Sequence, residues 1–520
     1  MARKSELGAW LGTISLGMLF WIGLAGLPGS ARYVPEPWDV LRVLLPEREV
    51  LLQQSLATLR AAIAGFFLGT VAAIGAAFLV VWYPRLRQSF VLTGVAVYSV
   101  PLIAAAPLVA LSLGPAHAGA ALGCIGAYLP MFLTGLRAGD RASKSFAEIV
   151  LVHGASRCSE LRLVRLPLMV RGWMVAAQAG WTWAVLGALI GDFTGGRWGL
   201  GTFLTGTLTR GEPARVWSVA ALCLVISGVG TAAIRFANLF FPSQATEDPL
   251  DATAPEPKEA IGERCRSLMV DLTSAMGLLA AWQCGAWIAS PGGGVLSGPL
   301  EIASAAHDVF VGTAALSVMD LTSALCSTVL AACVGLALSL ALAFALAASK
   351  HFFTILSRPF VLGVLITQVT PIVAFVPIIA LLFGRDLASV VIIVILSTIY
   401  PSYTVYERAF EDVPRVALDT IRLFGGGASS EFWYVRLPHA AWMSLVAIRL
   451  AVARALLGAI TAEYLLTGRG VGGLLGQARA LLDFRMVWLV CTLVAATTLV
   501  LDATARTLEG ALANFSKKVS

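Results

Sequence analysis

Long apolar runs separated by short polar segments make up most of this chain. Each run has about 20 residues or more, the length that a helix needs to cross the hydrocarbon core of a bilayer. Backbone polar groups find no partners in lipid, so such runs are expected to be helical. The pattern predicts twelve spans, at about 7–27, 56–82, 90–113, 118–137, 172–192, 215–240, 267–290, 321–348, 355–384, 387–406, 441–463 and 486–512.

The order of apolar runs starts again after the middle of the chain. Residues 241–264 are rich in Pro, Ala and charged residues, which is typical of a linker. We therefore predict a first transmembrane repeat at 1–240, a cytoplasmic linker at 241–264 and a second transmembrane repeat at 265–520. Each copy holds six spans, so the two copies are expected to be parallel. The predicted fold is all-α and polytopic.

Individual residues favour the same repeat. Matching residues recur at a spacing of 270 early in each half and 271 later: Gly65 with Gly335, Pro101 with Pro371, Pro107 with Pro377, Pro130 with Pro401, Gly199 with Gly470 and Trp217 with Trp488. One inserted residue between Pro377 and Pro401 explains the change of spacing.

The composition excludes a soluble protein of this length. Only 13% of the 520 residues are charged and 58% are hydrophobic, and the mean hydropathy is +0.82. So few charges cannot cover a soluble surface, whereas lipid can solvate the apolar one. The net charge of +7 is expected on cytoplasmic loops rather than at a nucleic-acid site. With the N-terminus inside, the basic loops fall on the cytoplasmic side, and so does the C-terminus. The eight Cys form no CxxC pair, which argues against a disulfide framework or zinc site.

Two polar segments occupy equivalent places between apolar runs. One runs from Glu148 to Pro167 and the other from Asp419 to Pro438, aligned without a gap at a spacing of 271. Each has a Gly six residues after its acidic residue and ends in Leu-Pro. Gly permits a tight turn at a helix end, and Pro stops or starts a helix. Each segment is therefore predicted to form a short rigid lever.

This spacing resembles the EAA loop of ABC-importer permeases. In that family the loop folds into a coupling helix that docks in a groove of the ATPase subunit. The resemblance places coupling loops at about 138–168 and 407–438. It assigns ATPase coupling to Glu148, Gly154, Ala155, Leu166, Pro167, Asp419, Gly425, Gly426, Leu437 and Pro438. The first copy departs from the family pattern, with Ile149-Val150 where Ala-Ala is preferred.

The resemblance also implies partners and a location. A fused permease of the type I importer class would bind two ATPase subunits and an external or periplasmic substrate-binding protein, in the inner membrane of a bacterium. A Walker A loop needs Gly-Lys, and no Lys of this chain follows a Gly. We therefore expect no ATPase site and no cofactor in the chain itself, with ATP bound by the partner subunits.

Several residues within the apolar runs are candidates for the substrate pathway. Arg454 lies deepest, and an intramembrane charge costs about 2.5–3.5 kcal/mol, so it is expected to face a cavity or a partner. Prolines in spanning helices suit a pathway wall or simple packing kinks, and these are Pro101, Pro107, Pro371 and Pro377. Gln368 lies close to the second pair and is expected in the same cavity.

Two carboxylates precede Gly-rich segments at equivalent positions. Asp192 and Glu463 either gate the outer mouth or cap helices there, and the second interpretation is favoured. The sequence around Glu463, with Gly470-Val471-Gly472, resembles permeases for nitrate, taurine and alkanesulfonates. That resemblance implies a small anion as substrate, with ferric iron and thiamine left open. An ion-coupled secondary transporter is the competing class, and a membrane enzyme is a third.

Overall fold

The computed structural model describes residues 33–140, 156–196, 198–210, 212–240, 261–289, 295–313, 316–352, 354–413 and 415–519, with eight separate positions between 15 and 26. These residues form helices and turns without a β-strand, so the all-α prediction is confirmed. Most of the expected linker and the run at 7–27 lie outside the described residues. Below, the first half means residues 33–240 and the second half residues 261–519.

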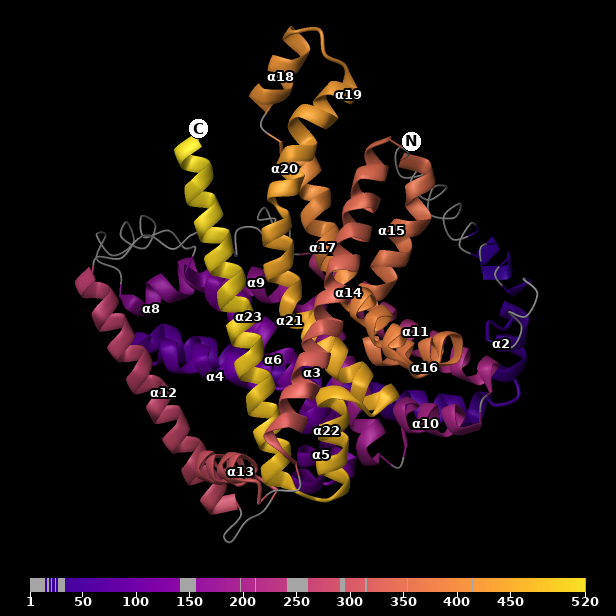
Figure 1. Ribbon diagram of the computed structural model, residues 1–520, viewed down its shortest axis with the longest axis vertical. Coiled ribbons are helices and arrows are strands. Elements are labelled where there is room, and N and C mark those ends of the chain that lie inside the picture. The colour runs from indigo at the N-terminus through magenta and orange to yellow at the C-terminus, as the bar shows by residue number, and fades with distance from the viewer. Residues whose placement is uncertain are drawn as a thin grey trace.

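The helices follow the same order in the two halves (Figure 1). The first half contains α2 (Pro37–Leu44), α3 (Arg48–Trp82), α4 (Arg87–Ser99), α5 (Leu102–Leu113), α6 (Pro115–Asp140), α8 (Arg157–Glu160), α9 (Leu166–Gly195), α10 (Leu200–Arg210) and α11 (Pro213–Asn238). The second half contains α12 (Ile261–Ala289), α13 (Pro299–Val311), α14 (Val318–Phe352), α15 (Thr354–Val369), α16 (Ile372–Phe383), α17 (Leu387–Glu411), α18 (Arg415–Leu423), α19 (Ala428–Glu431), α20 (Leu437–Trp442), α21 (Ser444–Ala462), α22 (Gly470–Ala480) and α23 (Phe484–Val519). Many bounds recur at spacings of 270 or 271, for example those of α3 with α14 and of α5 with α16.

Eight helices of the described chain are long and apolar enough to span a membrane, and they coincide with eight of the twelve predicted runs. Two further runs, at 90–113 and 355–384, are each broken into two helices. The break in the second is a bend of 118° between Ser357–Val369 and Ile372–Phe383. In α12 only Ala275–Ile288 is apolar enough to count as a short helix of this kind.

Proline and glycine explain the broken runs. Pro101 and Pro371 begin α5 and α16 with extended backbone, at ψ values of 124° and 131°. Neither Pro can donate a helix hydrogen bond, and each disfavours helical backbone in the residue before it. Gly114 and Gly384 then end the two short helices with φ values of +83° and +79°. The runs predicted at 90–113 and 355–384 are therefore each divided into two helices at Pro101 and Pro371.

The Leu-Pro pairs also behave differently from the prediction. Pro167 and Pro438 do not start new helices, because Cys158–Thr194 and Ala428–Thr467 each run on as one long helix. A π-helical turn precedes each Leu-Pro pair, at Leu161–Arg165 and Phe432–Arg436. The wider turn accommodates a Pro that lacks an N–H and crowds the carbonyl four residues earlier. These two helices therefore begin well before the expected 172 and 441.

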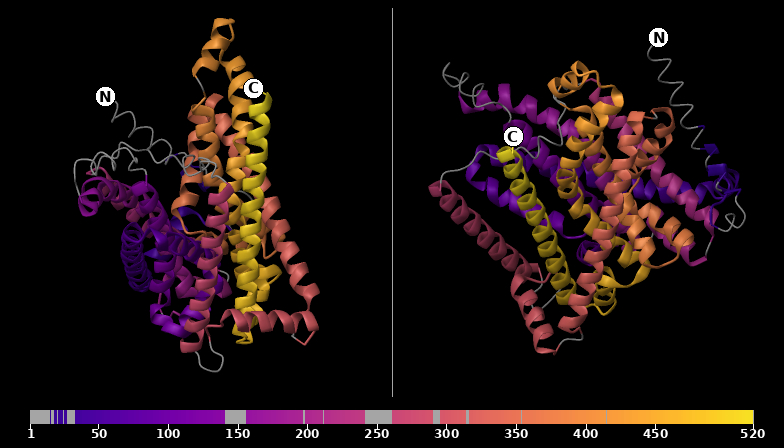
Figure 2. Two further views of the ribbon diagram at one scale, coloured as in Figure 1. Left: turned by 90° about the vertical axis from the view of Figure 1, so that its left-hand side faces the viewer. Right: turned by 45° about the horizontal axis from the view of Figure 1, so that its top comes forward.

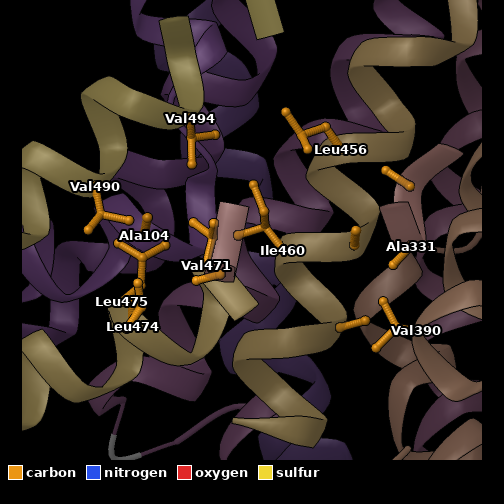
Figure 3. Close-up of a cluster of buried hydrophobic side chains, with 14 of the residues drawn as sticks. Ala104, Ala331, Val390, Leu456, Ile460, Val471, Leu474, Leu475, Val490 and Val494 are labelled. Atoms are coloured by element: carbon orange, nitrogen blue, oxygen red, sulfur yellow. The ribbon is translucent and has the colours of Figure 1, made fainter. Parts of the chain in front are cut away.

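The halves lie side by side and exchange a short helix (Figure 2). Ala104 and Leu108 of α5 belong to the core of the second half, and Ala374 and Ile378 of α16 belong to that of the first half. Figure 3 shows Ala104 among Val471, Leu475 and Val490. Long exposed rows of apolar side chains on α3 and α14 face outward, as a bilayer requires: Phe67, Leu68, Val71, Leu338 and Leu342.

Candidate functional site

A cavity of about 130 Å³ lies between the two halves. Its wall comes from α4, α5, α6 and α9 of the first half and from α15, α16, α17 and α21 of the second. These are equivalent sets of helices, so the cavity follows the junction of the halves. The breaks at Pro101 and Pro371 both lie on this wall. A membrane protein binds a small molecule most readily in such a place, where irregular backbone lines a cavity instead of facing lipid.

Arg454 supplies the charge of this cavity. It lies on α21, and the lining residues that the structure describes include no carboxylate. Within the described chain no acidic side chain forms an ion pair with Arg454, whereas Arg449, one turn earlier, pairs with Glu509 at 3.0 Å. A cation in a cavity without a counterion favours an anion there.

Gln368 and Thr370 bring further hydrogen-bond donors to the same wall. Both lie close to the break between α15 and α16. The hydroxyl of Thr370 is buried and has no hydrogen-bond partner among the described residues. By contrast, the hydroxyls of Thr367, Ser397 and Thr461 donate to carbonyls of their own helices. An unsatisfied buried hydroxyl costs about 1–3 kcal/mol, which a bound acceptor would recover.

Aromatic side chains form the opposite part of the wall. Tyr98 of α4 and Trp183 of α9 pack edge to face, with ring centroids 5.1 Å apart. Both residues line the cavity. Aromatic rings offer a large apolar contact area with a few polar atoms at the edge. The aromatic pair belongs to the first half, while Arg454, Gln368 and Thr370 belong to the second.

The other pathway candidates lie away from the cavity wall. Pro107 and Pro377 are buried inside α5 and α16 and are not among the lining residues. Asp192 and Glu463 are also outside the lining. For these four residues a direct contact with substrate is therefore not favoured by the geometry, and their pathway role stays a prediction.

Asp192 and Glu463 lie beside the start of two short helices, α10 and α22. The hydroxyl of Thr58 donates to Asp192 at 2.6 Å and accepts the Leu200 N–H. Thr328 donates in the same way to Glu463, at 2.8 and 2.9 Å. The N–H groups of Val471 and Gly472 complete this second cluster. Each carboxylate thus lies at the N-terminus of α10 or α22, where backbone donors and the helix dipole favour negative charge.

The two polar segments, Glu148–Pro167 and Asp419–Pro438, are called the first and second docking segments below. The second docking segment is a helix, a glycine turn and a second helix. At the end of α18, Gly425 has a φ of +78°, and its N–H donates to Arg422 while that of Gly426 donates to Ile421. These two bonds form a Schellman motif, which glycine allows without steric cost. Arg422 reaches across the turn to Glu431 at 2.7 Å and lies 3.6 Å from Asp419. The hydrogen bond to Glu431 raises the pKa of Arg422 above its usual value.

This segment projects beyond the rest of the second half (Figure 1). It exposes five large apolar and aromatic side chains: Val416, Leu423, Phe424, Trp433 and Tyr434. Phe424 is 87% exposed. Polar residues such as Asp419 and Arg422 lie beside them. An exposed apolar patch with a polar rim is typical of a protein-binding surface, and we call these five side chains the docking patch.

Part of the first docking segment is also described. Leu166 and Pro167 follow the π-helical turn, and Glu160 pairs with Arg165 at 2.9 Å. Glu160 is equivalent to Glu431, and both are buried. Glu148, Gly154 and Ala155 lie outside the described residues. The coupling role of both segments stays a prediction.

The comparison with protein families bears on the second half. Residues 335–514 match the family of binding-protein-dependent transport system inner membrane components. The match includes α15 to α22, hence the second-half wall of the cavity and the docking patch. No solved structure shows significant similarity to the chain.

The individual relatives of the chain are also named as transport permease proteins. The chain is 30% identical over 143 residues to the riboflavin transport system permease protein of Chloroflexus aurantiacus, which is 28% of this chain and 53% of that protein. It is 29% identical over 139 residues to an aliphatic sulfonates transport permease protein of Escherichia coli, again 53% of the relative and 27% of this chain. With the formylaminopyrimidine transport permease protein of Halalkalibacterium halodurans, identity is 24% over 43% of this chain and 91% of the relative. The chain thus spans about half the length of the first two of these relatives. Part of the chain is thus similar to permease components of binding-protein-dependent transport systems.

Sequence reasoning found part of the cavity wall and missed part. Arg454, Gln368, Pro101 and Pro371 were named as pathway candidates and line this cavity. Their role in a pathway stays a prediction. Tyr98 and Trp183 were missed, because an aromatic residue within an apolar run looks the same whether it faces lipid, core or cavity. The spacing of 270 and 271 offered a signal, since Tyr98 and Trp183 are equivalent to Gln368 and Arg454.

Proposed function

We propose that this chain is the permease of an ATP-driven importer and supplies both halves of the substrate pathway. The observation that carries the proposal is the continuous helix Ala428–Thr467. It contains Trp433 and Tyr434 of the docking patch and Arg454 and Thr461 of the cavity wall. A force on these two side chains of the docking patch would therefore reach the cavity along one helix. The helix Cys158–Thr194 has the same relation to Trp183.

The mechanism follows from this lever arrangement. Two ATPase subunits would bind one docking segment each and move together when they bind ATP. The two long helices would then tilt the halves against each other and open the cavity to alternate sides. An external or periplasmic binding protein would deliver the substrate. Both docking segments would face the cytoplasm of a bacterial cell, together with both chain ends.

The substrate that fits the cavity is a small molecule with an anionic group, such as a sulfonate, nitrate or taurine. Arg454 has no acidic partner among the described residues. A cation such as thiamine or ferric iron would meet this charge with no carboxylate to offset it. An ion-coupled transporter is less favoured, since Asp192 and Glu463 are held by Thr58 and Thr328 away from the cavity.

Co-purification tests the proposal. The tagged chain is expressed with the genes that neighbour its own and purified in mild detergent. A nucleotide-binding subunit at two copies per chain is expected, and the double variant Gly154→Glu/Gly425→Glu is expected to lose it. Recovery of the chain alone, with transport that needs no ATP, would contradict the proposal and favour a secondary transporter.

A further inference from the structure

The two halves contribute opposite chemistry to the cavity at equivalent positions. Tyr98 and Trp183 in the first half correspond to Gln368 and Arg454 in the second. The same contrast holds for the other polar lining residues of the second half. Thr367, Thr370, Ser397 and Thr461 correspond to Val97, Val100, Gly126 and Ile190. The first-half wall is thus mainly apolar and aromatic, with Thr182 as its hydroxyl besides that of Tyr98, and the facing wall is polar and cationic. The Thr182 hydroxyl donates to the Gln178 carbonyl of its own helix, at 3.2 Å.

The polar wall is suited to an acidic group. Arg454 offers a guanidinium, Gln368 an amide and Thr370 a buried hydroxyl that has no partner among the described residues. These are donors of three kinds that come from α21 and from the break between α15 and α16. A planar carboxylate or a sulfonate accepts several such bonds at once. A free amine has no such counterpart, since the described lining includes no carboxylate.

The aromatic wall is suited to a ring. Trp183 and Tyr98 hold each other edge to face at 5.1 Å, which fixes their orientation. Ile103, Leu186 and Ile190 continue this wall with apolar atoms. A flat ring gains both contact area and favourable quadrupole geometry against such a surface. A purely inorganic anion would leave the aromatic wall without a partner.

We propose that the cavity binds an aromatic or heteroaromatic anion, with its carboxylate or sulfonate on Arg454, Gln368 and Thr370 and its ring against Tyr98 and Trp183. This assignment rests on the proposed transport function and narrows its substrate class. Among small anions it favours ring-bearing sulfonates and carboxylates over nitrate and over the zwitterion taurine.

Three probes separate the two walls. Benzenesulfonate carries both groups, methanesulfonate carries the anion without the ring, and benzenesulfonamide carries the ring without the charge. Binding of each probe to the purified full chain is measured by equilibrium dialysis in detergent. We expect one benzenesulfonate site per chain, with an affinity at least about tenfold higher than for either of the other probes.

Variants then assign each group to its wall. Arg454→Gln is expected to weaken benzenesulfonate about tenfold and to leave benzenesulfonamide unchanged, while Arg454→Lys keeps part of the affinity. Trp183→Leu is expected to weaken benzenesulfonate about tenfold and to leave methanesulfonate unchanged. The matched controls are Arg485→Gln and Trp198→Leu, since both residues are exposed and outside the cavity lining. Gln368→Leu provides a second test of the polar wall that removes no charge.

Each contrary result has a definite meaning. Methanesulfonate that binds as tightly as benzenesulfonate would overturn the aromatic part, and equal binding of benzenesulfonamide would overturn the anionic part. The absence of benzenesulfonate binding at millimolar concentration would overturn both. The assay contains neither ATPase nor ATP, so it is independent of the docking experiment. Selective binding of benzenesulfonate by a chain that co-purifies with no ATPase would contradict only the importer mechanism. A bound ATPase together with unselective binding of the probes would contradict only the aromatic-anion assignment.

Discussion

The two halves share a backbone plan but pack their central helices differently. In the first half, Gly65 of α3 approaches the backbone of Gly123 on α6. At the equivalent place in the second half, Gly335 of α14 packs against the side chain of Val394 on α17. Gly123 and Gly126 also let α6 approach Ala184 and Trp183 on α9 closely. Close helix contacts through small residues are a common way to stabilise membrane proteins.

This difference in packing indicates which positions are the same in the two halves and which are not. Helix ends, proline breaks and carboxylate anchors recur at constant spacing, because each fixes the path of the backbone. Side chains at the centre of the halves do not recur in kind. The first half has close glycine contacts and an aromatic cavity wall, and the second has valine contacts and a polar wall. Variants that give one half the residue of the other test this comparison.

Gly123→Val gives the first half the residue that the second half has at this place. Of all the variants, we expect it to destabilise the protein most, because the added side chain would meet backbone atoms. A Cβ at Gly123 would lie 3.0 Å from the carbonyl oxygen of Ala184 and 3.3 Å from the Cα of Gly65. Overpacking of this kind costs about 1–3 kcal/mol and is worse against backbone that cannot move. We expect the yield of monodisperse protein in size-exclusion chromatography to fall severely.

Gly75→Val is the matched control on α3, because a side chain there meets no atom within 4 Å. It should leave the yield unchanged. Normal yield of Gly123→Val would mean that the glycine contacts of the first half are not needed for packing.

The docking segments offer the next comparison. Leu163 and Tyr434 are equivalent, and they are 68% and 74% exposed. If each half docks one ATPase subunit, Leu163→Asp and Tyr434→Asp should each reduce the bound ATPase from two copies to one, and the double variant should bind none. Quantitative mass spectrometry of the purified complex measures the ratio.

Trp198→Asp is the control for an added charge, since Trp198 is exposed outside both docking segments. A single variant that removes both ATPase copies would show that the halves dock cooperatively. Full binding by the double variant would contradict the docking role of these surfaces.

Loss of the threonine that holds Asp192 or Glu463 should have a smaller effect, which is a decrease in stability. The Thr328 hydroxyl lies 2.9 and 2.8 Å from the two oxygens of Glu463, and the Thr58 hydroxyl lies 2.6 Å from one oxygen of Asp192. Each hydroxyl has one proton, so each donates one hydrogen bond to its carboxylate. Each Thr also accepts a backbone N–H of the following helix. Thr→Val at either place leaves buried polar groups unpaired, which costs about 1–3 kcal/mol. We expect a lower Tm in detergent for both variants, with decreases of similar size.

Thr492→Val is a suitable reference, because the Thr492 hydroxyl is exposed and donates only to a carbonyl of its own helix, at 2.8 Å. An unchanged Tm for Thr58→Val and Thr328→Val would show that the carboxylates do not anchor α10 and α22.

The sequence predicted the helical fold better than it predicted the cavity. Apolar length located the spans, since lipid leaves a backbone few alternatives to a helix. The predicted helix starts at 172 and 441 were too late, because Pro167 and Pro438 were expected to start or stop a helix. A π-helical turn before each Pro instead lets the helix continue through it. Arg454 could be found from sequence, since a charge is rare in an apolar run. The residue type of Trp183 carries no such signal, and only its equivalence to Arg454 in the repeat pointed to it.

The smallest predicted effect concerns the glycine turn of the second docking segment. Gly425 has left-handed backbone at φ +78°, whereas Gly427 has extended backbone at φ −95° that any residue adopts. An L-residue in the left-handed region costs about 1 kcal/mol. Gly425→Ala should therefore speed hydrogen exchange at the Gly426 amide, which is bonded to Ile421 at 2.9 Å, by about fivefold. Gly427→Ala should leave this rate unchanged. Equal rates in the two variants would show that the left-handed backbone at Gly425 does not stabilise the end of α18.

Because Gly154 is equivalent to Gly425, the same change there tests the first docking segment. A similar increase in exchange after Gly154→Ala is expected if both segments end their helices in one way, and no increase would make the docking segments another point of difference between the halves.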